Sequence, residues 1–201
     1  SKSKSGFLSK KSDKTHTYDE TTVASELSAS SNVNFNADKN VAIAGSKVKA
    51  GENIAIEGDS VSVLGAQERH ESASSSKKSG IGVGSGNGLY SVYGKEQKSS
   101  SENIVANAGS QLSAGHDVSI KARESDVNIV GSKVDAKNDI NLEATRDVNI
   151  LPGAESYASE DKEKRSGFGL KFGSGNGSVS MGLGFGSSKD ETRQAAETNA
   201  V

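Results

Sequence analysis

The stretch LSAGHDVSIKARESDVNIVGSKVDAKNDINLEATRDVNI, residues 112–150, decides the fold of this 201-residue chain. It holds six apolar pairs whose members are separated by one residue, and each pair follows a short polar turn. A repeat of three such segments predicts a solenoid, in which one turn of the chain is one rung. The second three pairs follow the first three by 22, 22 and 21 residues; the pairs are Leu112/Ala114, Val118/Ile120, Val127/Ile129, Val134/Ala136, Ile140/Leu142 and Val148/Ile150.

An earlier part of the chain repeats this scheme. In a strand, the two members of each pair point to one face and the middle residue points to the other. Rungs stacked in this way place small aliphatic side chains in columns, which predicts an all-β, right-handed parallel β-helix. The earlier pairs follow each other at spacings of 21, 21 and 20; they are Leu27/Ala29, Val33/Phe35, Val41/Ile43, Val48/Ala50, Ile54/Ile56 and Val61/Val63.

Short polar residues mark the expected corners of the rungs. An Asn or Asp precedes most of the strand pairs, and its side chain can bond nearby backbone and tolerate a tight bend. Their regular recurrence favours a ladder of corners over generic turn composition. These residues are Asn32, Asn40, Asn53, Asp117, Asp126, Asp139 and Asp147.

Two related insertions interrupt the rungs. The sequence GSGNG at residues 84–88 recurs at residues 173–177, and each copy is the expected turn of a β-hairpin. The predicted segments are the tail of a preceding insertion (1–22), rungs (23–65), a glycine-rich hairpin (66–103), rungs (104–153), and a second glycine-rich hairpin with the start of the next repeat (154–201). The charged runs 68–78 and 160–165 are interpreted as solvated connections to the hairpins. We expect the chain to be a fragment of a longer filament.

The hairpins carry the candidate contact residues. Apolar side chains alternate with glycine or small polar residues, so one face of each ribbon is apolar, and an isolated hairpin with such a face needs a cover. The cover is either the flank of the β-helix or the neighbouring hairpin, or else a membrane or another protein. The first hairpin alternates less cleanly, which weakens the membrane alternative. The residues are Ile81, Val83, Leu89, Phe168, Leu170, Phe172, Val179, Met181, Leu183 and Phe185.

Composition excludes several classes of function. The chain has no cysteine, which excludes disulfides and thiolate chemistry, and its formal net charge of -2 gives no general attraction to nucleic acid. Its three histidines lie in separate repeat contexts, so no metal site or cofactor is expected. Acidic residues are scattered over turns, and Phe35 is the only aromatic residue of the rungs, which disfavours a carbohydrate-active β-helix. We expect no enzyme activity.

The rung motifs resemble a known family. GSKVKA at residues 45–50 and GSKVDA at residues 131–136, broken by Ser/Lys-rich and Gly-rich insertions, resemble the repeats of filamentous-haemagglutinin-type exoproteins. The likeness is greatest to the later repeat block of contact-dependent growth inhibition proteins, and it covers essentially the whole chain. It separates adhesins, haemolysins and toxin-delivery proteins poorly.

This resemblance implies a two-partner secretion substrate at the surface of a Gram-negative bacterium. The implied partners are an outer-membrane transporter during export, neighbouring repeats of the same filament, and the outer membrane of a target cell. Two functions remain open: a filament segment that assists toxin delivery, and a passive adhesin spacer whose hairpins buttress the shaft. The family offers no active-site residues to carry over.

Overall fold

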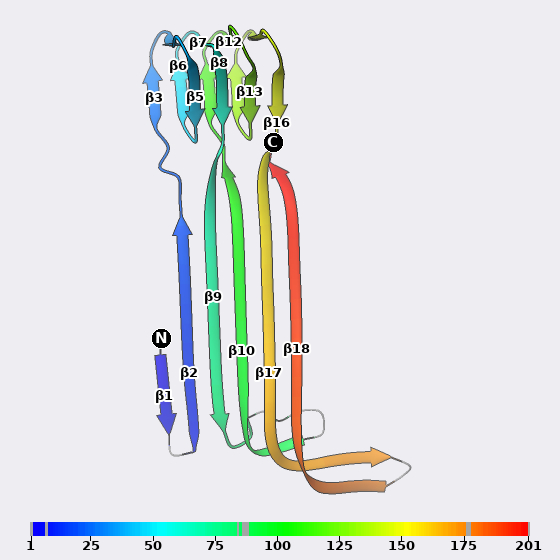
Figure 1. Cartoon of the computed structure of the whole chain (residues 1–201). Coiled ribbons are helices and arrows are strands. Elements are labelled where there is room, and N and C mark those ends of the chain that lie inside the picture. Colours follow the sequence, from blue (N-terminus) through cyan, green and yellow to red (C-terminus); the bar gives the residue numbers. More distant parts are fainter. Residues whose placement is uncertain (1, 7, 84, 86–88, 176–177, 201) are drawn as a thin grey trace. The chain divides into compact units, whose positions relative to one another are not determined.

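The computed structural model describes residues 2–6, 8–83, 85, 89–175 and 178–200, and this part of the chain is built from strands without helices (Figure 1). The all-β prediction is confirmed. Contacts divide the chain into two compact units, which are described separately below. One consists of Ser1–Tyr18, His70–Ile104 and Tyr157–Ala196, and the other of Asp19–Arg69, Val105–Ser156 and Glu197–Val201.

The second unit contains three four-stranded parallel sheets, which together we call the rung stack. Each turn of the chain gives one strand to each sheet, an arrangement consistent with a parallel β-helix. We number the turns as rungs 1 to 4. They are rung 1, β3 (Glu26–Ala29), β4 (Val33–Asn36) and β5 (Asn40–Ala44); rung 2, β6 (Lys47–Ala50), β7 (Ile54–Gly58) and β8 (Ser60–Leu64); rung 3, β11 (Gln111–Ala114), β12 (Val118–Ala122) and β13 (Val127–Val130); and rung 4, β14 (Lys133–Ala136), β15 (Ile140–Ala144) and β16 (Val148–Leu151).

The register of these strands follows the spacing of the apolar pairs. Val48 of rung 2 lies beside Leu27 of rung 1 and Leu112 of rung 3, and Leu112 in turn lies beside Val134. The other two sheets show the same pairing, since Val33, Ile54, Val118 and Ile140 form one row, and Val41, Val61, Val127 and Val148 form another. The predicted columns of aliphatic side chains are therefore present.

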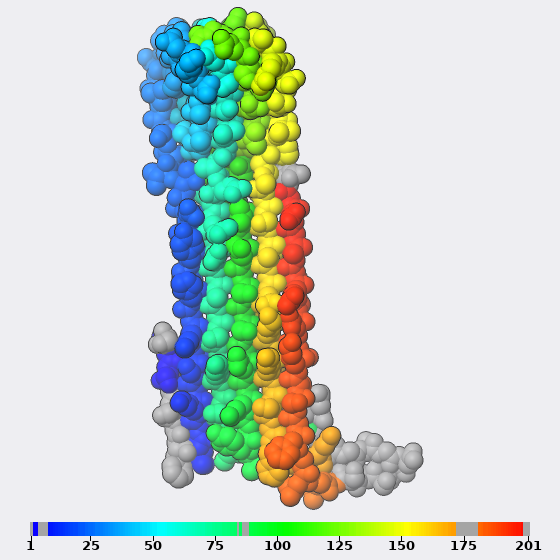
Figure 2. All heavy atoms as spheres, in the orientation of Figure 1, coloured from blue at the N-terminus to red at the C-terminus, as the bar shows by residue number. Residues whose placement is uncertain are grey.

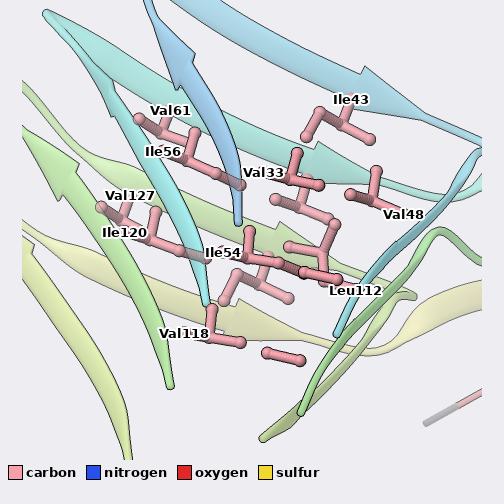
Figure 3. Packing of buried hydrophobic residues seen from close by; sticks show 14 of the residues in the cluster. Val33, Ile43, Val48, Ile54, Ile56, Val61, Leu112, Val118, Ile120 and Val127 are labelled. Atoms are coloured by element: carbon pink, nitrogen blue, oxygen red, sulfur yellow. The ribbon is translucent and has the colours of Figure 1, made fainter. Parts of the chain in front are cut away.

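The core of the rung stack is a narrow column of these side chains (Figure 3). Ile54, Val61, Leu112, Ile120 and Val127 have no exposed surface. Several of their neighbours in rungs 1 and 4, including Val41 and Leu142, are only partly buried, although Val33 of rung 1 is buried. Burial is therefore greatest in rungs 2 and 3, which have a rung on each side.

The Gly-Ser motif forms the corner between one rung and the next. Gly45 and Gly131 both have φ of +54°, a left-handed conformation that glycine adopts without the strain of a Cβ atom. The hydroxyl of the following serine donates a hydrogen bond to the carbonyl two residues earlier, over 2.8 Å from Ser46 to Ala44 and 3.0 Å from Ser132 to Val130. The motif thus turns the chain sharply enough to begin a new rung.

The remaining strands form one six-stranded sheet, which we call the hairpin sheet. β1 and β2 pair in antiparallel fashion, and Figure 1 shows the long strands in alternating directions. Figure 2 shows the same strands packed side by side. Their order along the sheet is β1-β2-β9-β10-β17-β18. The strands are β1 (Lys2–Gly6), β2 (Ser9–Glu20), β9 (Ala66–Gly80), β10 (Leu89–Ala108), β17 (Gly153–Gly175) and β18 (Ser178–Ala200).

The interpretation of the charged runs as connections is wrong. Residues 68–78 lie within β9, and residues 160–165 lie within β17, so these runs are strands of the sheet. Among the described large apolar residues of this sheet, only Leu89 is buried. The hairpin sheet therefore has polar, solvated surfaces along most of its length. For this reason the sequence of its polar runs lacks the alternation of apolar and polar residues that predicts a strand.

Candidate interaction surface

The most exposed apolar side chains of the hairpin sheet gather where β17 and β18 approach their turn. Met181, Leu183 and Phe185 are 68%, 73% and 83% exposed, and their period-two spacing puts them on one face of β18. Phe168 of β17 contacts Phe185 with ring centroids 5.0 Å apart and a tilt of 48°. We call Phe168, Met181, Leu183 and Phe185 the apolar patch. This geometry matches the alternation expected from the sequence.

Glycines beside the patch allow close backbone approach between hairpins. A Cβ atom on Gly169 would lie 1.9 Å from the carbonyl oxygen of Tyr90, and one on Gly94 would lie 2.7 Å from the carbonyl oxygen of Ser166. Because no side chain could fit there, the glycines let β10 and β17 pair closely. The alternating glycines thus serve strand packing as well as leaving one face nearly bare.

The first hairpin contributes differently from the second. Leu89 is buried, and a Cβ atom on Gly186 of β18 would lie 2.6 Å from its Cδ2 atom. The neighbouring hairpin therefore covers Leu89, as one of the two alternatives for these residues anticipated. Ile81 and Val83 lie in the turn after β9 and not in a strand, and Ile81 is exposed.

The other candidate residues are distributed as follows. Leu170 lies in β17 and is half-buried. The side chains of Phe172 and Val179 lie outside the described residues. Tyr93 and Lys95 of β10, which were not among the candidates, line a shallow hollow with Ser166, Phe168 and Phe185. Apolar residues and glycines alternate too irregularly around Tyr93 and Lys95 for the sequence to mark these two residues as candidate contact residues.

Ion pairs cross the hairpin sheet on its polar stretches. Arg193 of β18 lies 2.6 Å from Glu160 of β17, and Lys162 of β17 lies 3.8 Å from Glu191 of β18. Hydrogen bonding from Lys162 and the charge of Arg193 lower the pKa of Glu160. Charged residues thus join β17 to β18 along their polar stretches.

A second cluster of charges joins β10 to β17. Lys98 lies 3.1 Å from Glu96 and 3.2 Å from Glu163, and Arg165 lies 2.5 Å from Glu163. Hydrogen bonding from Arg165 holds the pKa of Glu163 below its usual value, and hydrogen bonding to Glu96 and Glu163 raises the pKa of Lys98. These groups sit in matched pairs, an arrangement that stabilises charged forms rather than a neutral acid or base.

Neither metal coordination nor a helical membrane span is found in the described residues. No group of three or more His, Asp or Glu side chains among them is placed to hold a metal ion. The same part of the chain has no helix long and apolar enough to cross a bilayer. The described residues of the hairpin sheet therefore offer an apolar surface and paired charges.

Comparison with known proteins identifies the repeat. A family profile described as Hemagglutinin repeat matches residues 7–94 and 91–201. The 16S rRNA endonuclease CdiA of Enterobacter cloacae is 35% identical over 85 residues, which are 41% of this chain and 3% of that protein. The Deoxyribonuclease CdiA of Dickeya dadantii is 33% identical over 93 residues, which are 44% of this chain and 3% of that protein.

A third relative extends the same pattern. The Toxin CdiA of Yersinia pestis is 40% identical over 60 residues, which are 30% of this chain and 2% of that protein. The chain therefore spans only a few per cent of the length of these curated relatives. No solved structure matches it significantly.

Proposed function

This chain belongs to the hemagglutinin repeat family with distant similarity to CdiA contact-dependent inhibition proteins, and we propose that it is a structural filament segment of a secreted exoprotein. The rung stack acts as a shaft, wound as a right-handed solenoid by the usual chirality of parallel crossovers. The hairpins are side elements of this shaft. We propose no catalytic role for this segment, because its charged side chains form ion pairs with one another. The activity in the relative's name also belongs to a much longer protein, of which this chain covers 3%.

The sharper part of the proposal concerns the target cell. We propose that the segment contacts the outer membrane of a Gram-negative target cell and assists toxin delivery, after export through an outer-membrane transporter. The observation that carries this proposal is the apolar patch, whose β18 side chains are more than two-thirds exposed on a sheet that is polar along most of its length. Exposed apolar clusters of this kind favour a membrane or a partner surface.

Liposome flotation tests this contact. The wild-type chain should float with vesicles made of phosphatidylethanolamine, phosphatidylglycerol and lipopolysaccharide, whereas the triple variant Phe168→Ser, Leu183→Ser, Phe185→Ser should remain at the bottom of the gradient. The matched control is Val23→Ser, Leu151→Ser, which removes exposed apolar side chains outside the hairpin sheet and should float. Equal flotation of wild type and triple variant, or none of either, contradicts membrane contact.

A passive adhesin spacer is the second candidate function. It is favoured by the burial of Leu89 against Gly186, which shows one hairpin covering an apolar residue of the other. In that case the apolar patch contributes only to packing between hairpins, and the triple variant lowers the melting temperature of the chain without changing its behaviour with vesicles.

A further inference from the structure

The face of the hairpin sheet that carries the apolar patch can be followed along β17 and β18. Phe168 contacts Phe185 near the turn, and Glu160 lies 2.6 Å from Arg193 further along the same two strands. Equal numbers of residues separate the two pairs on the two continuous strands, and every second side chain shares a face. The pairs between them on this face are therefore Lys162 with Glu191, Lys164 with Lys189, and Ser166 with Ser187.

Strand β10 adds a third lysine to this face. Lys95 lines the shallow hollow beside Phe168 and Phe185, next to Ser166. Because Ser166 lies between the aromatic ring and the lysine of β17, Lys95 stands close to both the apolar patch and the lysines of the second hairpin. We call Lys95, Lys164 and Lys189 the lysine row.

The lysine row meets little negative charge within the chain. Lys95 and Lys164 are exposed, and neither makes an ion pair in the described part of the chain. Lys189 lies 3.0 Å from Glu191, but that carboxylate also pairs with Arg193. The row therefore presents uncompensated positive charge beside the apolar patch, unlike the matched charges that join β10 to β17 on the polar stretch.

The first hairpin repeats the unpaired lysine. KKSG at residues 77–80 corresponds to KRSG at residues 164–167, so Lys77 occupies the place of Lys164. Lys77 is exposed and, like its counterpart, forms no ion pair among the described residues. The neighbouring Arg165, by contrast, pairs with Glu163. A lysine without an anionic partner thus precedes the glycine-rich segment in both hairpins.

A surface that covers the apolar patch also meets the lysine row. Lys164 precedes Phe168 by four positions, about 13 Å of strand, so a small ligand in the hollow would not reach both. A bilayer offers both partners in one plane, because its acyl chains cover aromatic rings and its phosphates attract lysines. Pairing of another strand with the edge of β18 would leave this face open, since side chains stand perpendicular to the sheet.

We propose that this face of the hairpin sheet lies against an anionic bilayer and that the lysine row binds the phosphate groups of its lipids. Phe168 and Phe185 enter the boundary between headgroups and acyl chains. Lys95 and Lys164 extend to the headgroups and donate charge-assisted hydrogen bonds to phosphate oxygens. The proposal rests on the proposed membrane contact of the apolar patch, and it adds the lipid chemistry that this contact selects.

Binding to vesicles of two compositions tests the lysine row. The wild-type chain should bind phosphatidylcholine vesicles that contain phosphatidylglycerol about a hundredfold more tightly than vesicles of phosphatidylcholine alone. The double variant Lys95→Gln, Lys164→Gln should bind the anionic vesicles roughly 25-fold more weakly than wild type and the neutral vesicles equally well. Lys95→Arg, Lys164→Arg keeps the charge and should retain binding. Salt at about 1 M, where the Debye length is ~3 Å, should abolish most of the preference.

A matched control separates the lysine row from overall net charge. Lys49→Gln, Lys137→Gln removes two exposed lysines from the rung stack, with the same change in net charge, and should bind as wild type does. An equal loss in this control overturns the proposal. Far-UV circular dichroism checks that each variant retains its strands.

The remaining outcomes distinguish this proposal from the membrane contact on which it rests. Equal binding of wild type and the glutamine double variant to anionic vesicles overturns the role of the lysine row and leaves the contact of the apolar patch in place. Binding only to vesicles that carry outer-membrane protein assigns the face to a protein partner and also overturns the proposal. Binding to no vesicle overturns the proposal and the membrane contact together.

Discussion

Replacing Ile120 with alanine tests the column that holds the rung stack together. Ile120 has no exposed surface and lies between Ile56 of rung 2 and Leu142 of rung 4. The substitution removes three carbon atoms, a transfer loss of about 2.4 kcal/mol at ~0.8 kcal/mol per methylene. Strands on both sides restrict collapse into the vacated space, so a cavity term brings the expected loss of unfolding free energy to about 3–4 kcal/mol.

Ile150→Ala is the matched control for this measurement. Ile150 pairs with Ile129 in the same kind of column, but it lies in the end rung and is largely exposed. The same chemical change should therefore cost less than about 1 kcal/mol. Urea unfolding followed by far-UV circular dichroism, at a concentration low enough to keep the chain monomeric, compares the two variants. Equal losses for both, or a loss below about 1 kcal/mol for Ile120→Ala, would refute nearest-neighbour column packing.

Three further results are expected. Gly131→Ala should destabilise the chain by at least about 1 kcal/mol, because φ of Gly131 is +54° and the new Cβ would lie 2.7 Å from Asn107 and Gly153. Gly182→Ala is the control: a Cβ at this position meets nothing within 4 Å, so the change should be neutral in thermal unfolding. Asp117→Ala should cost about 1 kcal/mol in urea unfolding by removing the acceptor for Asp139, and Asp117→Asn should keep most of it, because Asn53 already fills this role. Hydrogen bonds from neighbouring Lys and Arg side chains lower the pKa of three carboxylates, from Lys162 to Glu160, from Arg165 to Glu163 and from Lys189 to Glu191. These carboxylates therefore bind protons less readily in the folded chain than in the unfolded chain. The stabilisation that they give the folded chain is complete above the unfolded pKa of about 4.3, and it is lost as the pH falls through the lower native pKa values. A melting temperature that does not change between neutral pH and about pH 3 would contradict this assignment of the ion pairs.

The rungs could be predicted from the sequence because their stability depends on spacing. Val41 and Val61 are twenty positions apart, and the structure pairs them directly. The corner residues could also be anticipated, since Asn53 and Asp117 precede strands and accept hydrogen bonds from the next rung. Short-range patterning and the long-range contact coincide in a repeat of this kind, so the register could be read without knowing the three-dimensional structure.

The extent of the hairpins could not be predicted in the same way. Residues 68–78 contain Glu, Arg, Lys and Ser without alternating apolar positions, because neither face of β9 packs against a core. The pairing of β10 with β17 and the cover over Leu89 depend on which hairpins are neighbours, which no local pattern specifies. At the candidate site, the alternation of Met181, Leu183 and Phe185 was visible, whereas the turn positions of Ile81 and Val83 were not.

The polar character of the hairpin sheet bears on the choice between the two candidate functions. In pairs such as Glu160 with Arg193 the arginine is exposed and the glutamate partly so, and solvent-exposed ion pairs contribute little to stability. Such pairs still join the strands, so strand pairing does not require apolar side chains along the sheet. A spacer could therefore be polar throughout. The sheet instead places exposed Leu183 and Phe185 on one face of β18, where a Ser or Lys side chain would pair strands equally well. Their apolar surface favours contact with a membrane or a partner surface over a purely structural role, because either contact would remove it from water.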